Sequence, residues 1–257
     1  MRYKKGGPLI DNSFLFRLCS ALTFYPVWHI AQLVNIILYS TSYGDRAKLR
    51  KYKGRAVLVS NHTTFLDPVL VSGAMMPGRT WHTMLEKTVE TPFLGTFTRL
   101  LGGLPLPPGG SGIEKIIASS EAIFKYRRFI HFYPEGECYI YNQKIMPFKT
   151  GAFYVAARLG LPVFPLLTVF SEGLLKPKTP FSRRFPKERL VVLDPVYPSA
   201  YIRYNEDGSI AMPSVKEFAA AVYEIMCKEI DRRRGLDGRD GTQSYFKGRM
   251  LRIKGVN

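Results

Sequence analysis

Cysteine is scarce in this chain of 257 residues, which contains only Cys19, Cys138 and Cys227. Their number is odd, they lie far apart, and no two of them form a CxxC pair. Disulfide frameworks and cysteine-bound zinc sites depend on paired cysteines, so neither is expected here. We therefore predict three ordinary thiols in a reducing compartment.

Acidic residues are also few: 20 Asp and Glu stand against 37 Lys and Arg, which gives a formal net charge of +17. Such an excess attracts a polyanion, and charge alone leaves nucleic acid and an anionic lipid surface equally open. The chain also lacks the GxSxG, HExxH, P-loop and GxGxxG motifs. Serine hydrolases, zinc proteases and nucleotide-binding proteins that depend on those motifs are therefore excluded.

Only one long apolar run is present, over residues 14–39. A membrane-spanning helix needs roughly 20 mostly apolar residues, so the run is long enough. Arg17 lies near its start and Pro26 in its middle, where proline removes a helical hydrogen bond. Its second half carries polar side chains at every third position: His29, Gln32 and Asn35. These features predict two short helices in the headgroup region; the alternatives are a spanning helix, a buried helical hairpin and a cleaved signal peptide.

From residue 56 onward, strand-like apolar segments alternate with segments of helical periodicity. The strands are predicted at 56–60, 80–85, 104–106, 128–133, 163–170 and 190–193. The helices are predicted at 68–76, 93–101, 114–126, 150–159 and 215–234. Such alternation predicts an α/β fold with a mostly parallel central sheet covered by helices. We divide the chain into amino-terminal membrane-docking helices (1–42), the α/β domain (43–234) and a basic tail (235–257).

The first candidate site follows the first predicted strand, where Asn61, His62 and Asp67 occur. Ligands bind at the carboxyl ends of strands in open α/β sheets, and histidine transfers protons near neutral pH. A carboxylate bonded to one ring nitrogen would fix the tautomer of His62. Asp67 precedes Pro68, which disfavours a helix before it, so the intervening residues could bend and let the two side chains meet. The alternative is that Asp67 is only a helix N-cap.

A second candidate site follows the strand predicted at 128–133, in the order Tyr-Pro-Glu-Gly. Glu135 could bind hydroxyls or cations, and Gly136 would let a ligand approach the backbone closely. Because this segment also follows a strand, it could lie beside His62. An ordinary turn is the alternative.

Taken together, the Asn-His pair with Asp five positions after the histidine and the later Tyr-Pro-Glu-Gly resemble the glycerolipid acyltransferase family, typified by lysophosphatidic acid acyltransferases. The likeness continues in Phe-Lys-Thr-Gly at 148–151 and in Leu-Pro-Val-Phe-Pro-Leu at 161–166. It covers roughly residues 50–170, and the apolar run resembles the membrane-docking helices of the family.

The resemblance implies an O-acyltransferase in which His62 is the general base and Asp67 orients it. Asn61, Glu135, Gly136 and Lys149 would bind the acceptor. The acyl donor would be acyl-CoA or acyl carrier protein, with no cofactor, no metal and no covalent acyl-enzyme. The expected partners are an anionic membrane surface at the cytoplasmic face and a lysolipid acceptor, and no nucleic acid is expected.

Two departures from the family pattern concern the acceptor. The stretch 102–108 lacks the arginine that grips the acceptor phosphate in the family, and Glu137 stands where threonine or serine is usual. Arg79, Arg99 or Lys115 could replace the missing cation. The resemblance makes a lysophosphatidic acid acyltransferase-like activity the first hypothesis, whereas these two departures make the pocket less favourable for a phosphomonoester. An acyltransferase for a non-phosphate lipid and a non-catalytic basic membrane-binding protein are the alternatives.

Overall fold

The computed structural model describes residues 3–171 and 186–234, so the basic tail predicted at 235–257 lies outside the described residues. The strands of the described part form one sheet in the order β1-β7-β6-β2-β5-β3-β4. Their bounds are β1 Ser42–Gly44, β2 Ala56–Ser60, β3 Thr80–Leu85, β4 Gly103–Leu106, β5 Phe129–Phe132, β6 Val163–Ser171 and β7 Lys187–Val192. Every neighbouring pair is parallel except β6 with β7, which confirms the predicted mostly parallel sheet.

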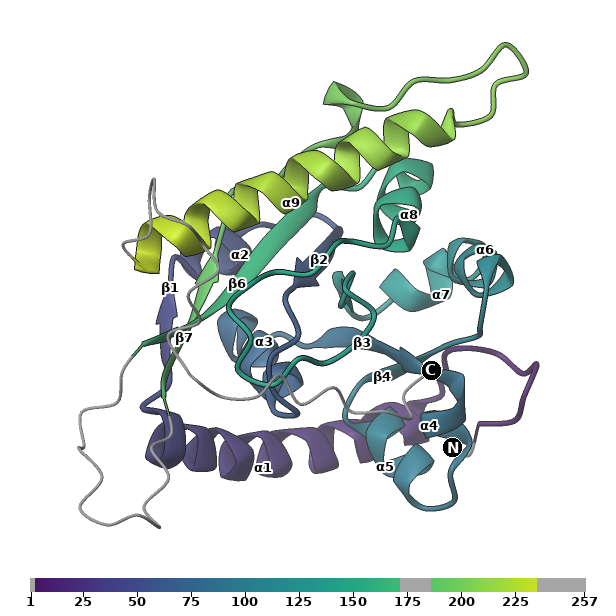
Figure 1. The fold of residues 1–257 in the computed structure, drawn as a ribbon. Helices are drawn as coiled ribbons and strands as arrows, with labels where there is room; N and C mark the ends of the chain where they lie inside the picture. The colour runs from purple at the N-terminus through teal and green to yellow at the C-terminus, as the bar shows by residue number, and fades with distance from the viewer. Residues whose placement is uncertain (1–2, 172–185, 235–257) are drawn as a thin grey trace.

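Helices cover both faces of the sheet (Figure 1). Their bounds are α1 Phe14–Tyr39, α2 Ala47–Lys51, α3 Asp67–Met75, α4 Glu86–Glu90, α5 Leu94–Leu100, α6 Gly110–Ala118, α7 Ser120–Phe124, α8 Gly151–Leu159 and α9 Met212–Arg234. Successive side chains of a strand point to opposite faces of the sheet, so β2 contributes to the core on both faces. Val57 and Val59 pack in the cluster that contains α8 and α9, whereas Ala56 and Leu58 pack with α2 and α3.

The short elements differ most from the sequence prediction. The helix predicted at 114–126 is divided near Ser119 into α6 and α7. Three elements of at most five residues, β1, α2 and α4, were not predicted, because so few residues carry no readable periodicity. The end of α8 agrees with the sequence: Gly160 terminates the helix in the left-handed conformation, at φ 62°.

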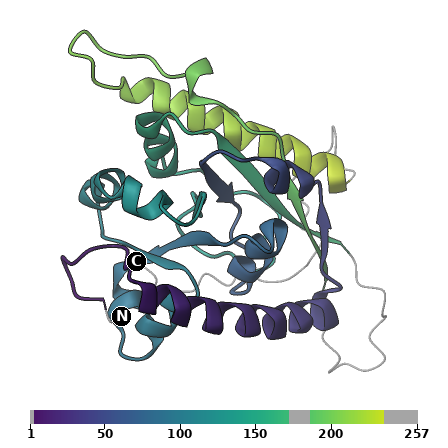
Figure 2. The same cartoon turned by 180° about the vertical axis from the view of Figure 1, so that it is seen from behind.

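The apolar run forms one continuous helix, α1, so the prediction of two short helices is wrong. Pro26 lies inside α1, and the helix packs against the rest of the protein on both sides of it. Before it, Phe16 and Phe24 are buried; after it, the indole N–H of Trp28 donates to the backbone oxygen of Val69 on α3 at 2.9 Å. Figure 2 shows α1 lying along the side of the molecule opposite α9.

The polar side chains of α1 do not all face outward, as the headgroup prediction required. Gln32 and Asn35 are buried against the α/β unit, and the hydroxyl of Tyr43 donates to Oε1 of Gln32 at 2.9 Å. β1 begins at Ser42, next to the boundary predicted between the docking segment and the α/β domain. Leu9, with its neighbours, belongs to the main core cluster, so the amino-terminal segment packs as part of the α/β unit.

Candidate active site

His62 and Asp67 meet at the carboxyl end of β2, in the middle of the sheet. Residues 61–66 are non-helical before α3 begins at Asp67, as the position of Pro68 predicted. This bend places Nδ1 of His62 2.8 Å from Oδ2 of Asp67. A sharp loop between a buried strand and a helix thus brings the base and the carboxylate together.

Asp67 is the centre of the loop's hydrogen bonding. Its Oδ2 accepts from Nδ1–H of His62 and from the backbone N–H groups of Thr63 (2.6 Å) and Thr64 (3.0 Å). Its Oδ1 accepts from the hydroxyls of Thr63 (3.2 Å) and Thr64 (2.8 Å). An N-cap side chain accepts from N–H groups that follow it in the helix, whereas these donors precede Asp67. Leu66 holds the N-cap position of α3, so the N-cap alternative is wrong. The carboxylate instead holds the loop and the histidine ring.

This arrangement determines the tautomer of His62. Because the Asp67 oxygen can only accept, Nδ1 of His62 carries the proton and Nε2 keeps its lone pair. Within the described residues no hydrogen-bond partner of Nε2 is found, and the side chain of His62 is 20% exposed. An accessible, unprotonated ring nitrogen with a carboxylate behind it is the arrangement that removes a proton from an alcohol.

A buried aromatic layer supports the His62 ring, and the sequence did not reveal it. The ring of Tyr133 stacks on His62 with centroids 3.8 Å apart and planes inclined by 18°. His131 packs edge-on against Tyr133 at 4.5 Å. The only sequence signal for Tyr133 is its place directly before the Pro-Glu-Gly segment.

Behind this layer, four buried side chains form a hydrogen-bonded chain. Ser60 bonds to Nε2 of His131 (2.9 Å), the two Nδ1 atoms of His131 and His82 lie 3.1 Å apart, and Nε2 of His82 bonds to Ser72 (3.0 Å). Burial lowers the pKa of His82 to about 3 and that of His131 well below its ordinary value. Both rings are therefore neutral, so the chain supports the site without adding charge to it.

The second candidate segment lies beside His62, as the sequence predicted. Oε1 of Glu135 accepts from the backbone N–H of His62 at 3.2 Å. Gly136 has φ +76°, and a Cβ added there would collide with Nζ of Lys149, so the lysine side chain crosses directly over this glycine. The backbone N–H of Lys149 donates to the oxygen of Pro134 at 2.8 Å. The Asn-His, Pro-Glu-Gly and Phe-Lys segments thus form one site.

Asn61 joins two strands rather than facing the opening of the site. Its side-chain NH₂ donates to the backbone oxygen of Thr168 at 3.0 Å, and its Oδ1 accepts from the N–H of Thr168 at 2.8 Å. It is 2% exposed. Both ends of the amide are therefore occupied in fixing the start of the His62 loop to β6.

A third segment, which sequence reasoning missed, lies over the loop. The backbone N–H groups of Tyr139 and Tyr141 donate to the carbonyl oxygens of His62 and Thr63, each at 2.9 Å. The hydroxyl of Tyr141 lies 2.9 Å from that of Tyr39, at the end of α1. These bonds connect the amino-terminal helix to the loop that carries His62.

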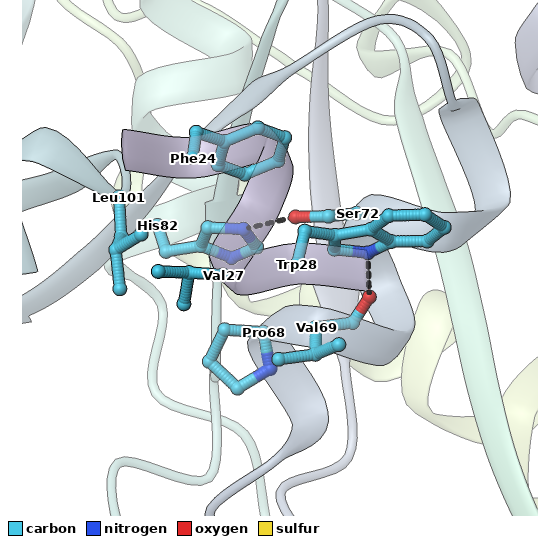
Figure 3. A pocket seen from close by; sticks show the side chains of 8 residues that line it. All are labelled: Phe24, Val27, Trp28, Pro68, Val69, Ser72, His82 and Leu101. Carbon is cyan, nitrogen blue, oxygen red and sulfur yellow. Dashed lines mark hydrogen bonds between the residues drawn. The ribbon is translucent and has the colours of Figure 1, made fainter. Parts of the chain in front are cut away.

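An apolar cavity of about 70 Å³ lies behind the loop, between α1 and α3 (Figure 3). Its lining residues are Phe24, Val27, Trp28, Pro68, Val69, Ser72, His82 and Leu101. Pro68 adjoins Asp67, and the Ser72–His82 bond lies at the cavity wall. The packing of α1 therefore reaches the helix that carries Asp67.

Two of the arginines expected to replace the missing cation lie at the wrong edge of the sheet. Arg79 directly precedes β3. Thr80 at the start of β3 and Ala56 at the start of β2 both pair with Phe129 of β5, so Arg79 lies beside the amino-terminal end of β2. At about 3.3 Å per residue, the site after β2 is roughly 20 Å away. Arg99 precedes β4 at the same edge and donates to the oxygen of Leu9. Lys115, on α6, stays a prediction.

Glu135 gives the site a pH dependence that stability measurements should detect. Burial, assisted by Asp67, raises the pKa of Glu135 to about 8. Between its ordinary pKa of 4.5 and about 8, the folded protein holds a proton that the unfolded chain releases, so stability should fall as pH rises through this window. Glu135→Gln should make the fall of the melting temperature with rising pH shallower. Glu121→Gln, an exposed change on α7, should leave it unchanged, and equal slopes for the two variants would contradict the assignment.

Comparison with known proteins agrees with this geometry. The model of the acyltransferase family matches residues 41–169. The 1-acyl-sn-glycerol-3-phosphate acyltransferase of Saccharomyces cerevisiae is 29% identical over 173 residues, which cover 66% of this chain and 54% of that protein. The Escherichia coli protein of the same name is 28% identical over 180 residues, covering 69% of this chain and 67% of its own length. This chain therefore spans about half the length of the yeast relative and two thirds of the bacterial one.

A solved structure shares the fold. The 1-acyl-sn-glycerophosphate acyltransferase PlsC from Thermotoga maritima superposes with a TM-score of 0.59 at 19% identity, over 84% of this chain and 81% of that one. The family match spans half of the chain and includes β2, the His62–Asp67 loop, the Pro-Glu-Gly segment and the start of β6. This chain belongs to the acyltransferase family.

Proposed function

We propose that this protein transfers a fatty acyl group from a thioester, acyl-CoA or acyl carrier protein, to the free hydroxyl of a lysophospholipid, with lysophosphatidic acid as the first candidate acceptor. The observation that carries the proposal is the His62 ring: Nδ1 is held by Asp67 at 2.8 Å, Nε2 has no hydrogen-bond partner within the described residues, and the side chain is 20% exposed. The names of the yeast and bacterial relatives support the choice of acceptor.

The reaction follows from the two ring nitrogens. Nε2 of His62 takes the proton of the acceptor hydroxyl as its oxygen attacks the thioester carbonyl. The tetrahedral intermediate then collapses, an ester bond replaces the thioester bond, and the thiolate leaves with the proton returned by the imidazolium. Asp67 stabilises that imidazolium and keeps its orientation. This route needs neither a covalent acyl-enzyme nor a cofactor.

The remaining site residues have different roles in this proposal. Glu135 and Asn61 hold the backbone of the loop through the bonds described above. Because Gly136 has no side chain, the exposed Lys149 can extend across it. We assign Lys149 to the anionic head of the acceptor.

The outer face of α1 supports docking at a membrane. α1 is the one helix of residues 3–171 and 186–234 that is long and apolar enough to cross a bilayer, judged by length and composition alone. Its exposed apolar side chains are Phe14, Leu15, Leu18, Leu22, Ile30, Leu33, Val34, Ile36, Ile37 and Leu38. Because its inner face packs on α3 and α5, we propose that it lies in the plane of the interface, at the cytoplasmic face where the thioester donors occur.

The function is tested with purified protein, labelled acyl-CoA or acyl carrier protein, and a panel of acceptors. The panel contains lysophosphatidic acid, lysophosphatidylcholine and monoacylglycerol. Labelled diacyl product from lysophosphatidic acid is the expected result. If no lysolipid is acylated with either donor, the proposal is wrong, and a non-catalytic membrane-binding protein becomes the better explanation.

A zwitterionic or uncharged acceptor is the second candidate, and the charges near the site favour it. Glu137 stands two residues after Glu135, and Arg79 and Arg99 are at the opposite edge of the sheet. A phosphomonoester would approach a carboxylate without the forked arginine that normally binds it.

Glu137→Thr should therefore improve the use of lysophosphatidic acid. Removing a like charge at an effective dielectric near 20 is worth on the order of 1 kcal/mol, which is about fivefold in kcat/KM. Lysophosphatidylcholine turnover should change much less, and the exposed Glu121→Thr should affect neither acceptor. Competition kinetics between the two acceptors measures the ratio. If the ratio stays at the wild-type value, Glu137 does not influence acceptor choice.

A further inference from the structure

Two arginines share one serine hydroxyl beneath the amino-terminal half of α1. Nη1 of Arg79 and Nη2 of Arg127 each donate to Oγ of Ser20 at 3.1 Å. Ser20 lies on the inner face of α1 and donates its own hydroxyl to the oxygen of Leu100 at 2.6 Å. The hydroxyl is thereby fully used, with two accepted bonds and one donated, and it holds the two guanidinium groups close together.

A third cation, Arg17, lies one turn before Ser20 on α1 and stacks on the ring of Tyr126 at 3.6 Å. Besides burial, the positive charge of Arg17 helps to lower the pKa of Arg79, and the positive charge of Arg79 helps to lower the pKa of Arg127. Burial, followed by the repulsion of Arg79, lowers the pKa of Arg127 to about 9. The three side chains thus form one cationic cluster.

No carboxylate within the described ranges forms an ion pair with any member of this cluster. Arg127 is 5% exposed; its other contacts are the backbone oxygen of Thr80 at 2.7 Å and the face of Trp81. Holding like charges together in a partly buried place opposes folding, because neither repulsion nor desolvation is offset by an acid. Aromatic rings lie against these arginines, among them Phe24 and Tyr25 at 5.7 Å from Arg79, and an anion that binds from outside would offset the remaining cost.

The position of the cluster indicates which anion. Arg17 and Arg79 are only partly buried, whereas Arg127 is 5% exposed and contributes charge from below. The same half of α1 exposes Phe14, Leu18 and neighbouring apolar side chains to the side proposed to meet the bilayer. A helix lying in the interface would place these arginines at the depth of lipid phosphates, which guanidinium groups bind with paired hydrogen bonds.

We propose that Arg17 and Arg79 bind the phosphate of an anionic membrane phospholipid, at a site roughly 20 Å from His62 and separate from the acceptor site. The inference rests on the proposed docking of α1 at a membrane. It adds a specific headgroup contact that would fix the orientation of the protein on the bilayer. The net charge of +17 acts over the whole surface, whereas this site acts at one end of α1.

The test is cosedimentation of the full chain with vesicles of phosphatidylcholine alone and of phosphatidylcholine with phosphatidylglycerol. Arg79→Gln should weaken binding to the phosphatidylglycerol vesicles by about tenfold, as expected for a lost charge-assisted contact, and should leave binding to phosphatidylcholine unchanged. Arg50→Gln is the matched control, an exposed arginine on α2 away from α1 in both views (Figure 1, Figure 2). Equal losses for the two variants would overturn the proposal.

Two further measurements keep the outcomes distinct. Arg17→Gln repeats the test at a half-buried position that makes no contact with Ser20 in the bonds described, should Arg79→Gln fold poorly. If inorganic phosphate alone raises the melting temperature of the wild type but not of the variant, and vesicle binding is unchanged, the site binds free phosphate and the lipid assignment is wrong. Failure of α1 docking itself would instead abolish binding to both kinds of vesicle.

Discussion

His62→Ala should reduce acyl transfer by about 10²–10⁴-fold, which is the usual contribution of a general base. The ring donates to Asp67, stacks on Tyr133 and is 20% exposed, so its loss removes the proton acceptor without opening the core. The melting temperature and vesicle binding should therefore stay close to those of the wild type. Initial rates with labelled acyl-CoA measure the effect.

The matched control for this substitution is His29→Ala. His29 is an exposed histidine on α1, and its Nδ1 contacts only the backbone oxygen of Tyr25 among the bonds described. This variant should transfer acyl groups at nearly the wild-type rate. Activity of His62→Ala close to that of His29→Ala would contradict the mechanism, even if the family assignment stands.

The central part of the fold could be predicted because its signals are local. β2 and β3 agree with the predicted bounds, since each is a short apolar run between turn residues. The contact between His62 and Asp67 could also be predicted, because Pro68 disfavours helical residues before it and the helix therefore begins only at Asp67.

Other parts of the site depend on strand order, which periodicity does not encode. β2 lies between β6 and β5, and this neighbourhood brings Tyr133 under His62 and Thr168 to Asn61. Arg79 could not be ruled out as the phosphate-binding cation for the same reason. The end of the strands at which it lies becomes known only from the register of β3 with β5. The continuity of α1 was missed because its stabilising contacts come from α3 and the main core cluster, not from its own sequence.

Asp67→Asn should reduce turnover by on the order of 10²–10⁴-fold and should also lower stability. The amide is nearly the same size, but it carries no charge to stabilise the His62 imidazolium. The present Oδ2 accepts three N–H groups, and an amide NH₂ in that place would face donors only. With the amide oxygen there instead, the NH₂ would meet the hydroxyls of Thr63 and Thr64, which could turn to accept.

The second orientation is the less costly one, so we expect Asp67→Asn to fold with a loss of about 1–3 kcal/mol of stability. Thr64→Ala is the variant that separates structure from charge. It removes the 2.8 Å hydroxyl bond to Oδ1 yet keeps the carboxylate and its bond to His62. It should therefore lose comparable stability while keeping most of its turnover. Measuring kcat and melting temperature for both variants decides the point: if they lose activity in the same proportion as stability, Asp67 acts on the loop alone and not on the charge of the catalytic histidine.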